Sequence, residues 1–107
     1  VNVALINNGY LGMVRQWQEL FYERRYSETP MRSPDFVKIA EAHGLTSMRV
    51  SERSQVIPAI QAARAADGTT LIDFRVEKED MVYPMVPTGA GLSDMIRRPV
   101  FDPEMEF

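Results

Sequence analysis

The fold is decided by the opening of the chain, which reads Val1-Asn2-Val3-Ala4-Leu5-Ile6-Asn7-Asn8-Gly9. Its β-branched and aliphatic residues predict a strand in the interior of a sheet. The two asparagines and the glycine that follow predict a sharp turn, because these residues tolerate a positive φ. Large apolar residues then recur at helical spacing between Gly12 and Tyr22, so an amphipathic helix should follow the turn.

Two further helices are indicated by their end signals. Ser33-Pro34-Asp35 predicts a helix start, with Ser33 as the cap and Pro34 at the first helical position, and Gly44 can end that helix in a left-handed conformation. A third helix is expected to begin at a Ser54 cap and to run to Ala66. Pro58 would then lie in its first turn, where a missing N–H costs least.

Strands over residues 46–50 and 69–76 complete the pattern. Strands that alternate with helices predict parallel pairing through helical crossovers. We therefore expect an α/β fold, the C-terminal portion of a doubly wound, mainly parallel sheet flanked by helices. Residues 1–76 should form the α/β core. Residues 77–107 are rich in proline and predict an irregular C-terminal tail with one helical turn near residues 92–96.

Composition excludes several classes of protein. The chain has 107 residues, a net charge of −3 and no cysteine, which excludes a disulfide scaffold, thiolate catalysis and Cys-ligated zinc. A negative net charge argues against the basic surface that nucleic-acid binding requires. No apolar run is long enough to cross a membrane. We expect a cytoplasmic protein, or a plastid one if the source is a plant.

The turn between Asn7 and Leu11 is the first candidate site, because ligands of open parallel sheets bind beyond the carboxyl ends of the strands. Two interpretations of the amide pair are open on the residues alone. One is an ordinary turn. The other is a site where an Asn side-chain oxygen joins backbone carbonyls around a hard cation such as magnesium.

The stretch Asn7-Asn8-Gly9-Tyr10-Leu11-Gly12-Met13-Val14-Arg15-Gln16-Trp17 resembles the end of the thiamine-diphosphate motif in the large, catalytic subunits of the acetolactate synthase (acetohydroxyacid synthase) family. Later segments resemble that family in the same order, and they are residues 18–22, 25–29, 35–42 and 84–89. Amide pairs occur in many thiamine-diphosphate enzymes. The run Leu11-Gly12-Met13-Val14 joined to Gln16-Trp17 is more specific.

The resemblance implies a reaction, cofactors and partners. Two pyruvates would give 2-acetolactate and CO2, or pyruvate would condense with 2-oxobutyrate, in branched-chain amino-acid biosynthesis. Thiamine diphosphate would supply the chemistry and Mg²⁺ would neutralise its diphosphate. FAD would bind mainly outside this chain. Catalytic subunits would form a homodimer or tetramer and could bind a small regulatory subunit, without nucleic acid or membrane.

The resemblance also assigns site residues, none of them catalytic. The side chain of Asn8 and the carbonyl of Tyr10 would hold the metal, and the cofactor-binding residues would be Asn8, Tyr10, Leu11, Gly12 and Met13. The substrate channel, which is also the herbicide site, would be lined by Met13, Val14, Trp17 and Thr88. On the residues alone, Trp17 is by default a core residue, whereas Thr88 is as compatible with a surface turn as with a channel position. Gln16 is a weaker polar candidate beside the site.

The sequence departs from the family pattern in one respect. The Gly-Asp-Gly motif that should precede the amide pair is not found, and only six residues precede Asn7. We therefore expect a fragment of a longer enzyme, a partial thiamine-diphosphate-binding domain without activity of its own. The apolar helix face around Met13, Trp17 and Phe21 should then be partly uncovered. The alternatives are another thiamine-diphosphate-dependent 2-oxo acid carboligase or decarboxylase, and a non-catalytic α/β interaction domain.

Overall fold

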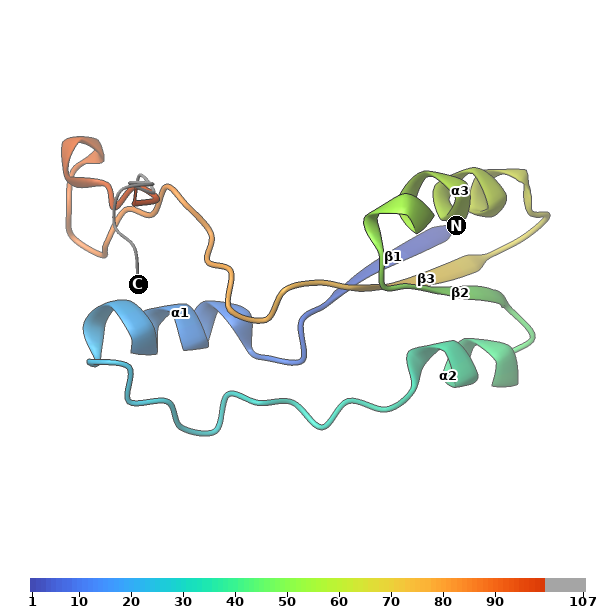
Figure 1. Cartoon of the computed structure of the whole chain (residues 1–107), viewed down its shortest axis with the longest axis horizontal. Helices are drawn as coiled ribbons and strands as arrows, with labels where there is room; N and C mark the ends of the chain where they lie inside the picture. The colour runs from blue at the N-terminus through green and yellow to red at the C-terminus, as the bar shows by residue number, and fades with distance from the viewer. Residues whose placement is uncertain (100–107) are drawn as a thin grey trace.

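The computed structural model describes residues 1–99 and contains an α/β core with an irregular C-terminal segment (Figure 1). The predicted tail extends to residue 107, and its residues 100–107 lie outside the described part. The elements are β1 (Asn2–Asn7), α1 (Gly12–Phe21), α2 (Phe36–Ala42), β2 (Thr46–Val50), α3 (Arg53–Ala65), β3 (Thr70–Arg75) and the 3-10 turn η1 (Leu92–Asp94). This order of elements confirms the predicted one. None of the described helices is long and apolar enough to cross a membrane.

The three strands form one parallel sheet in the order β1-β3-β2, as predicted. Ile72 of the central strand β3 is in register with Ala4 on one side and Met48 on the other. Helices α2 and α3 cover opposite faces of the sheet (Figure 1). The core is small, with a buried apolar cluster of Val50, Ala59, Ala63 and Ile72, and Ala40 of α2 is also buried. The sheet thus presents the carboxyl ends of all three strands at one edge.

Strand β1 is less buried than the sequence indicated. It pairs only with β3 within residues 1–99, and the side chains of Val3 and Ile6 are 42% and 66% exposed. The prediction of an interior strand is therefore wrong for the described sheet, because no second strand covers the outer edge of β1. Its aliphatic composition still directs the backbone into an extended conformation.

The helix caps differ from the predicted ones. Helix α2 is capped by Asp35, whose Oδ1 accepts hydrogen bonds from Val37 N at 3.1 Å and Lys38 N at 3.2 Å. Ser33 and Pro34 therefore precede the helix, because a carboxylate nearer the helix satisfies two free amides at once. The predicted ending at Gly44 is confirmed, with φ +72°.

Helix α3 begins one residue before the predicted Ser54 cap. The side chain of Gln55 reaches back and its Oε1 accepts from the amides of Ser51 at 2.9 Å and Glu52 at 3.1 Å. This capping-box arrangement moves the start of the helix to Arg53. Pro58 consequently lies in the second turn of α3 and not in the first.

Helix α1 stands away from the sheet, beside the C-terminal segment (Figure 1). Within residues 1–99 it makes no extensive contact with any strand. Met13, Trp17 and Phe21 are 48%, 44% and 48% exposed. The predicted uncovering of this apolar face is therefore confirmed.

Candidate functional site

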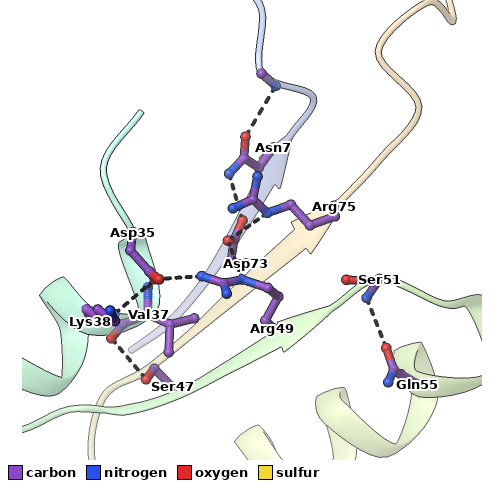
Figure 2. A network of polar contacts seen from close by, with 11 residues as sticks. Asn7, Asp35, Val37, Lys38, Ser47, Arg49, Ser51, Gln55, Asp73 and Arg75 are labelled. Atoms are coloured by element: carbon purple, nitrogen blue, oxygen red, sulfur yellow. Dashed lines mark hydrogen bonds and ion pairs between the residues drawn. The ribbon is translucent and has the colours of Figure 1, made fainter. Parts of the chain in front are cut away.

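The turn after β1 is anchored through the first asparagine of the pair. Asn7 Nδ2 donates a hydrogen bond of 2.9 Å to Asp73 Oδ1, and Asn7 Oδ1 accepts the amide of Gly9 at 3.3 Å. Figure 2 shows this chain of contacts running from β3 to the turn. Asn7 is only 8% exposed. Its side chain is therefore used inside the protein and shapes the turn.

The second asparagine and the two residues after it are half-buried. Asn8 Oδ1 accepts the amide of Tyr10 at 3.0 Å, and Gly9 adopts a φ of +74°, which glycine tolerates without strain. Within residues 1–99 the carbonyl of Tyr10 receives no hydrogen bond. An amide oxygen keeps a second lone pair after one hydrogen bond. The two oxygens predicted as metal ligands, Asn8 Oδ1 and Tyr10 O, are thus both able to accept a cation.

The loop segment that contains Thr29 and Met31 holds the turn in place. Leu11 N donates to Thr29 O at 2.9 Å, and Met31 N donates to Gly9 O at 2.8 Å. Arg15 also lies over the ring of Tyr10, with its guanidinium carbon 5.4 Å from the ring centre. These contacts restrict the backbone on both sides of Tyr10, so its carbonyl has a defined direction.

The start of α1 lies directly against Asn8. A Cβ at Gly12 would lie 2.9 Å from Asn8 Nδ2, closer than real Cβ contacts. The N-cap Leu11 provides no side-chain cap, and the first turn contains no acidic residue. The free first-turn amides of a helix favour an anion. Of the predicted cofactor residues, Gly12 and Met13 are the first two residues of α1, while the N–H of Leu11 is engaged by Thr29 O.

Asp73 is a site residue that the sequence reasoning missed. It is fully buried in β3, and its Oδ2 lies 3.1 Å from Arg75 Nε and 3.4 Å from Arg49 Nε. Arg49 also pairs with the capping residue Asp35 (Figure 2). The sequence signal for this role was a carboxylate inside the apolar run of residues 70–74, because a buried charge needs oppositely charged or hydrogen-bonding partners.

The same network acts on Asp35. The hydrogen bond from the Lys38 backbone amide, together with the charge of Arg49, lowers the pKa of the Asp35 carboxyl below its ordinary value. Asp35 is therefore an anion at neutral pH, as a cap of α2 requires.

A depression of about 470 Å³ lies at the carboxyl ends of β1 and β3. Asn7, Asn8 and Gly9 form one wall, and Ser51 and residues 75–78 form the rest. No group of three or more His, Cys, Asp or Glu side chains that could hold a metal is found in the described part of the chain. The metal ligands predicted from the sequence, an amide oxygen and a carbonyl oxygen, are of the type that Mg²⁺ prefers, and of the two residues only Asn8 lines this depression.

A second, more apolar groove of about 360 Å³ lies between α1 and the C-terminal segment. Its lining residues are Trp17, Phe21, Tyr22, Met85, Pro87 and Thr88. It thus brings together two predicted channel residues, Trp17 and Thr88, that are distant in the sequence. Val14 and Trp17 line a neighbouring hollow, while Met13 lines neither. Within the described residues Trp17 is 44% exposed and does not belong to the core.

Gln16 does not act as a free polar group beside the site. Its side chain is 3% exposed, and its Nε2 donates to Val82 O at 2.9 Å while its Oε1 accepts from Val82 N at 2.8 Å. The expectation of an available polar group is wrong, because both ends of the amide are occupied by the backbone of Val82.

Comparison with known proteins gives a consistent result. The family model described as "Thiamine pyrophosphate enzyme, C-terminal TPP binding domain" matches residues 1–74. The chain is 48% identical to the acetolactate synthase large subunit of Corynebacterium glutamicum, over 95% of this chain and 18% of that protein. It is 42% identical to the mitochondrial acetolactate synthase catalytic subunit of Saccharomyces cerevisiae, over 99% of this chain and 15% of that protein. The chain therefore spans less than a fifth of the length of these relatives.

Proposed function

Since the chain belongs to the family of thiamine pyrophosphate enzyme C-terminal TPP binding domains, we propose that it forms the cofactor-binding part of an acetolactate synthase catalytic subunit. One observation carries this proposal. The family model ends at residue 74, whereas the likeness to the acetolactate synthases covers 95% to 99% of the chain. It therefore includes the segment with Thr88, which a general cofactor domain would not explain. In this proposal residues 1–76 are the α/β core of a partial domain and 77–107 its tail.

The turn and the start of α1 fit the cofactor and its metal. Asn8 Oδ1 and the Tyr10 carbonyl, which accepts no hydrogen bond within residues 1–99, would hold Mg²⁺. The first-turn amides of Gly12 and Met13 would receive the diphosphate, next to Leu11, whose own N–H is engaged by Thr29 O. Because Gly12 has no Cβ, the side-chain amide of Asn8 fits in its observed position. When bound, thiamine diphosphate supplies an electron sink for the decarboxylation of a 2-oxo acid.

The residues of this chain then have distinct tasks. Asp73 and Asn7 hold the turn rigid, so that the two ligand oxygens keep a defined geometry. The groove between Trp17 and Thr88, with Met13 and Val14 nearby on α1, would form part of the channel for the second 2-oxo acid and for channel-blocking herbicides. Flat aromatic walls of this kind distinguish substrates that differ by one methylene.

The complete protein is proposed to have the partners of an acetolactate synthase. The exposed apolar face of α1 would be covered by other parts of the enzyme, in a dimer or tetramer of catalytic subunits. FAD would bind mainly outside this chain, and a small regulatory subunit could be added. A cytoplasmic location is part of the same proposal, since the chain has no cysteine and needs no disulfide.

Product analysis of the complete enzyme tests this function. With pyruvate alone we expect 2-acetolactate and CO2, and with added 2-oxobutyrate we expect 2-aceto-2-hydroxybutyrate, both dependent on thiamine diphosphate and Mg²⁺. Release of a free aldehyde without condensation would identify a decarboxylase instead. A folded protein that consumes no 2-oxo acid would support a non-catalytic interaction domain.

A further inference from the structure

A single buried side chain joins α1 to the segment of residues 81–88. The amide of Gln16 pairs with both backbone groups of Val82, donating to its carbonyl at 2.9 Å and accepting from its N–H at 2.8 Å. Its Nε2 also lies 3.3 Å from Met85 Sδ. Within residues 1–99, no other hydrogen bond joins α1 to this segment. The attachment of the segment therefore depends on Gln16.

This attachment determines one wall of the apolar groove. Met85, Pro87 and Thr88 follow Val82 closely in the sequence and face Trp17, Phe21 and Tyr22 of α1 and its end across the groove. Met85 is itself fixed, because it pairs with Ile96 through hydrogen bonds of 2.9 and 2.7 Å. Gln16 contacts this segment at both Val82 and Met85, so loss of its amide would let the segment with Pro87 and Thr88 shift relative to the ring of Trp17.

The amide is well suited to such a role. A buried polar group destabilises the fold unless it is paired, and here the donor and the acceptor of Gln16 both have partners. The two hydrogen bonds also hold Val82 at one position beside α1, whereas apolar contacts alone would let it slide along the helix. A shape-selective groove needs a fixed wall of this kind.

We propose that Gln16 is a positioning residue that sets the width of the groove between Trp17 and Thr88 and thereby the preference between second 2-oxo acid substrates. This inference rests on the proposed function. Gln16 acts through Val82 and does not touch the substrate, because its amide is buried and fully engaged. The chemistry of the first substrate does not depend on this wall.

The test compares Gln16→Met with Gln61→Met in the complete enzyme. Gln61 is an exposed residue of α3 and does not line the groove, so it serves as the control. Gln16→Met should lower the preference for 2-oxobutyrate over pyruvate by about tenfold, while the first decarboxylation of pyruvate changes by less than about twofold. Gln61→Met should leave the product ratio unchanged.

Amide hydrogen exchange of residues 81–88 gives a readout that does not depend on activity. The Val82 N–H should exchange faster in Gln16→Met and keep its rate in Gln61→Met, because only the first substitution removes its acceptor. Gln16→Leu, which also removes both the donor and the acceptor of the side chain, should show the same two effects if the methionine variant does not fold.

The outcomes separate this inference from the proposed function. An unchanged product ratio despite faster exchange would overturn the selectivity role of Gln16. Equal loss of the first decarboxylation and of the second step would show a general structural role and would also overturn it. A wild-type enzyme without carboligation would refute the proposed function, while the exchange experiment would still report on the attachment of the segment.

Discussion

The side-chain amide of Asn7 donates a hydrogen bond of 2.9 Å to the buried carboxylate of Asp73, 66 positions away in the sequence. This contact joins the end of β1 to the central strand β3. The same amide accepts the N–H of Gly9, so the contact also determines the shape of the turn that carries Asn8 and Tyr10. The core of the sheet thereby positions the predicted metal ligands.

Replacement of Asp73 should destabilise the fold. Asp73→Asn places an amide N–H₂ where Arg49 and Arg75 both donate, so a buried set of charged hydrogen bonds is broken. We expect a loss of about 1–3 kcal/mol in the free energy of unfolding, measured by urea denaturation. The control is Asp80→Asn, whose exposed pair with Arg98 should contribute little. Equal stability of wild type and the Asp73 variant would contradict this role.

Asp35 should contribute to stability in a pH-dependent way. Its folded-state pKa is lowered from 3.8, mainly by the Lys38 backbone hydrogen bond and also by Arg49. Its contribution is therefore complete above 3.8 and is lost as the pH falls through the lowered value. Asp35→Asn keeps a good cap and removes only the charge. The stability difference between wild type and variant should shrink from about pH 5 to about pH 2 in urea titrations, and a constant difference would refute the expectation.

Gly12→Ala should weaken Mg²⁺ binding without lowering the stability of the fold. The new Cβ would lie 2.9 Å from Asn8 Nδ2 and displace this amide. Alanine suits the helix, so stability should stay constant or rise by up to about 1 kcal/mol. In the complete enzyme, Mg²⁺ titration should show an affinity lower by about tenfold. Gly91→Ala is the control, because its Cβ would make an ordinary contact of 3.4 Å. Wild-type Mg²⁺ affinity in the Gly12 variant would argue against Asn8 as a ligand.

Trp17→Leu in the complete enzyme should lower the preference for 2-oxobutyrate and weaken the binding of channel-blocking herbicides. The exposed ring forms one wall of the groove opposite Thr88, and a smaller side chain fits the extra methylene less closely. We expect a change of about tenfold in the product ratio under substrate competition. Ile57→Ala, at a 66% exposed position on α3, should have no effect. A ratio that does not change would count decisively against the channel assignment.

The 107-residue chain by itself should bind thiamine diphosphate and Mg²⁺ very weakly and should catalyse no carboligation. The candidate ligands are one neutral side-chain oxygen and one carbonyl, and no acidic cluster is found within residues 1–99. A site without a carboxylate ligand holds Mg²⁺ poorly. Isothermal calorimetry should therefore show no stoichiometric binding in the micromolar range, and such binding would refute the prediction.

Local sequence patterns were sufficient to predict most of the helices and strands. Gly44 and the run of residues 46–50 identified a helix end and a strand, because both depend on the conformations of neighbouring residues. The caps of α2 and α3 were placed wrongly, since several residues near each helix start are able to cap. Asp35 and Gln55 were selected by contacts with Arg49 and with the Ser51 backbone, respectively.

The order of neighbouring residues was enough to predict the alternation of strands and helices, the amide-pair turn and the apolar face of α1. Folding of the chain was needed to bring Asn7 to Asp73, Trp17 to Thr88 across a groove, and the Gln16 amide to Val82. These pairs are more than 60 residues apart in the chain. No local periodicity encodes such contacts, which arise only when the packed elements bring distant side chains within hydrogen-bonding distance or across one groove.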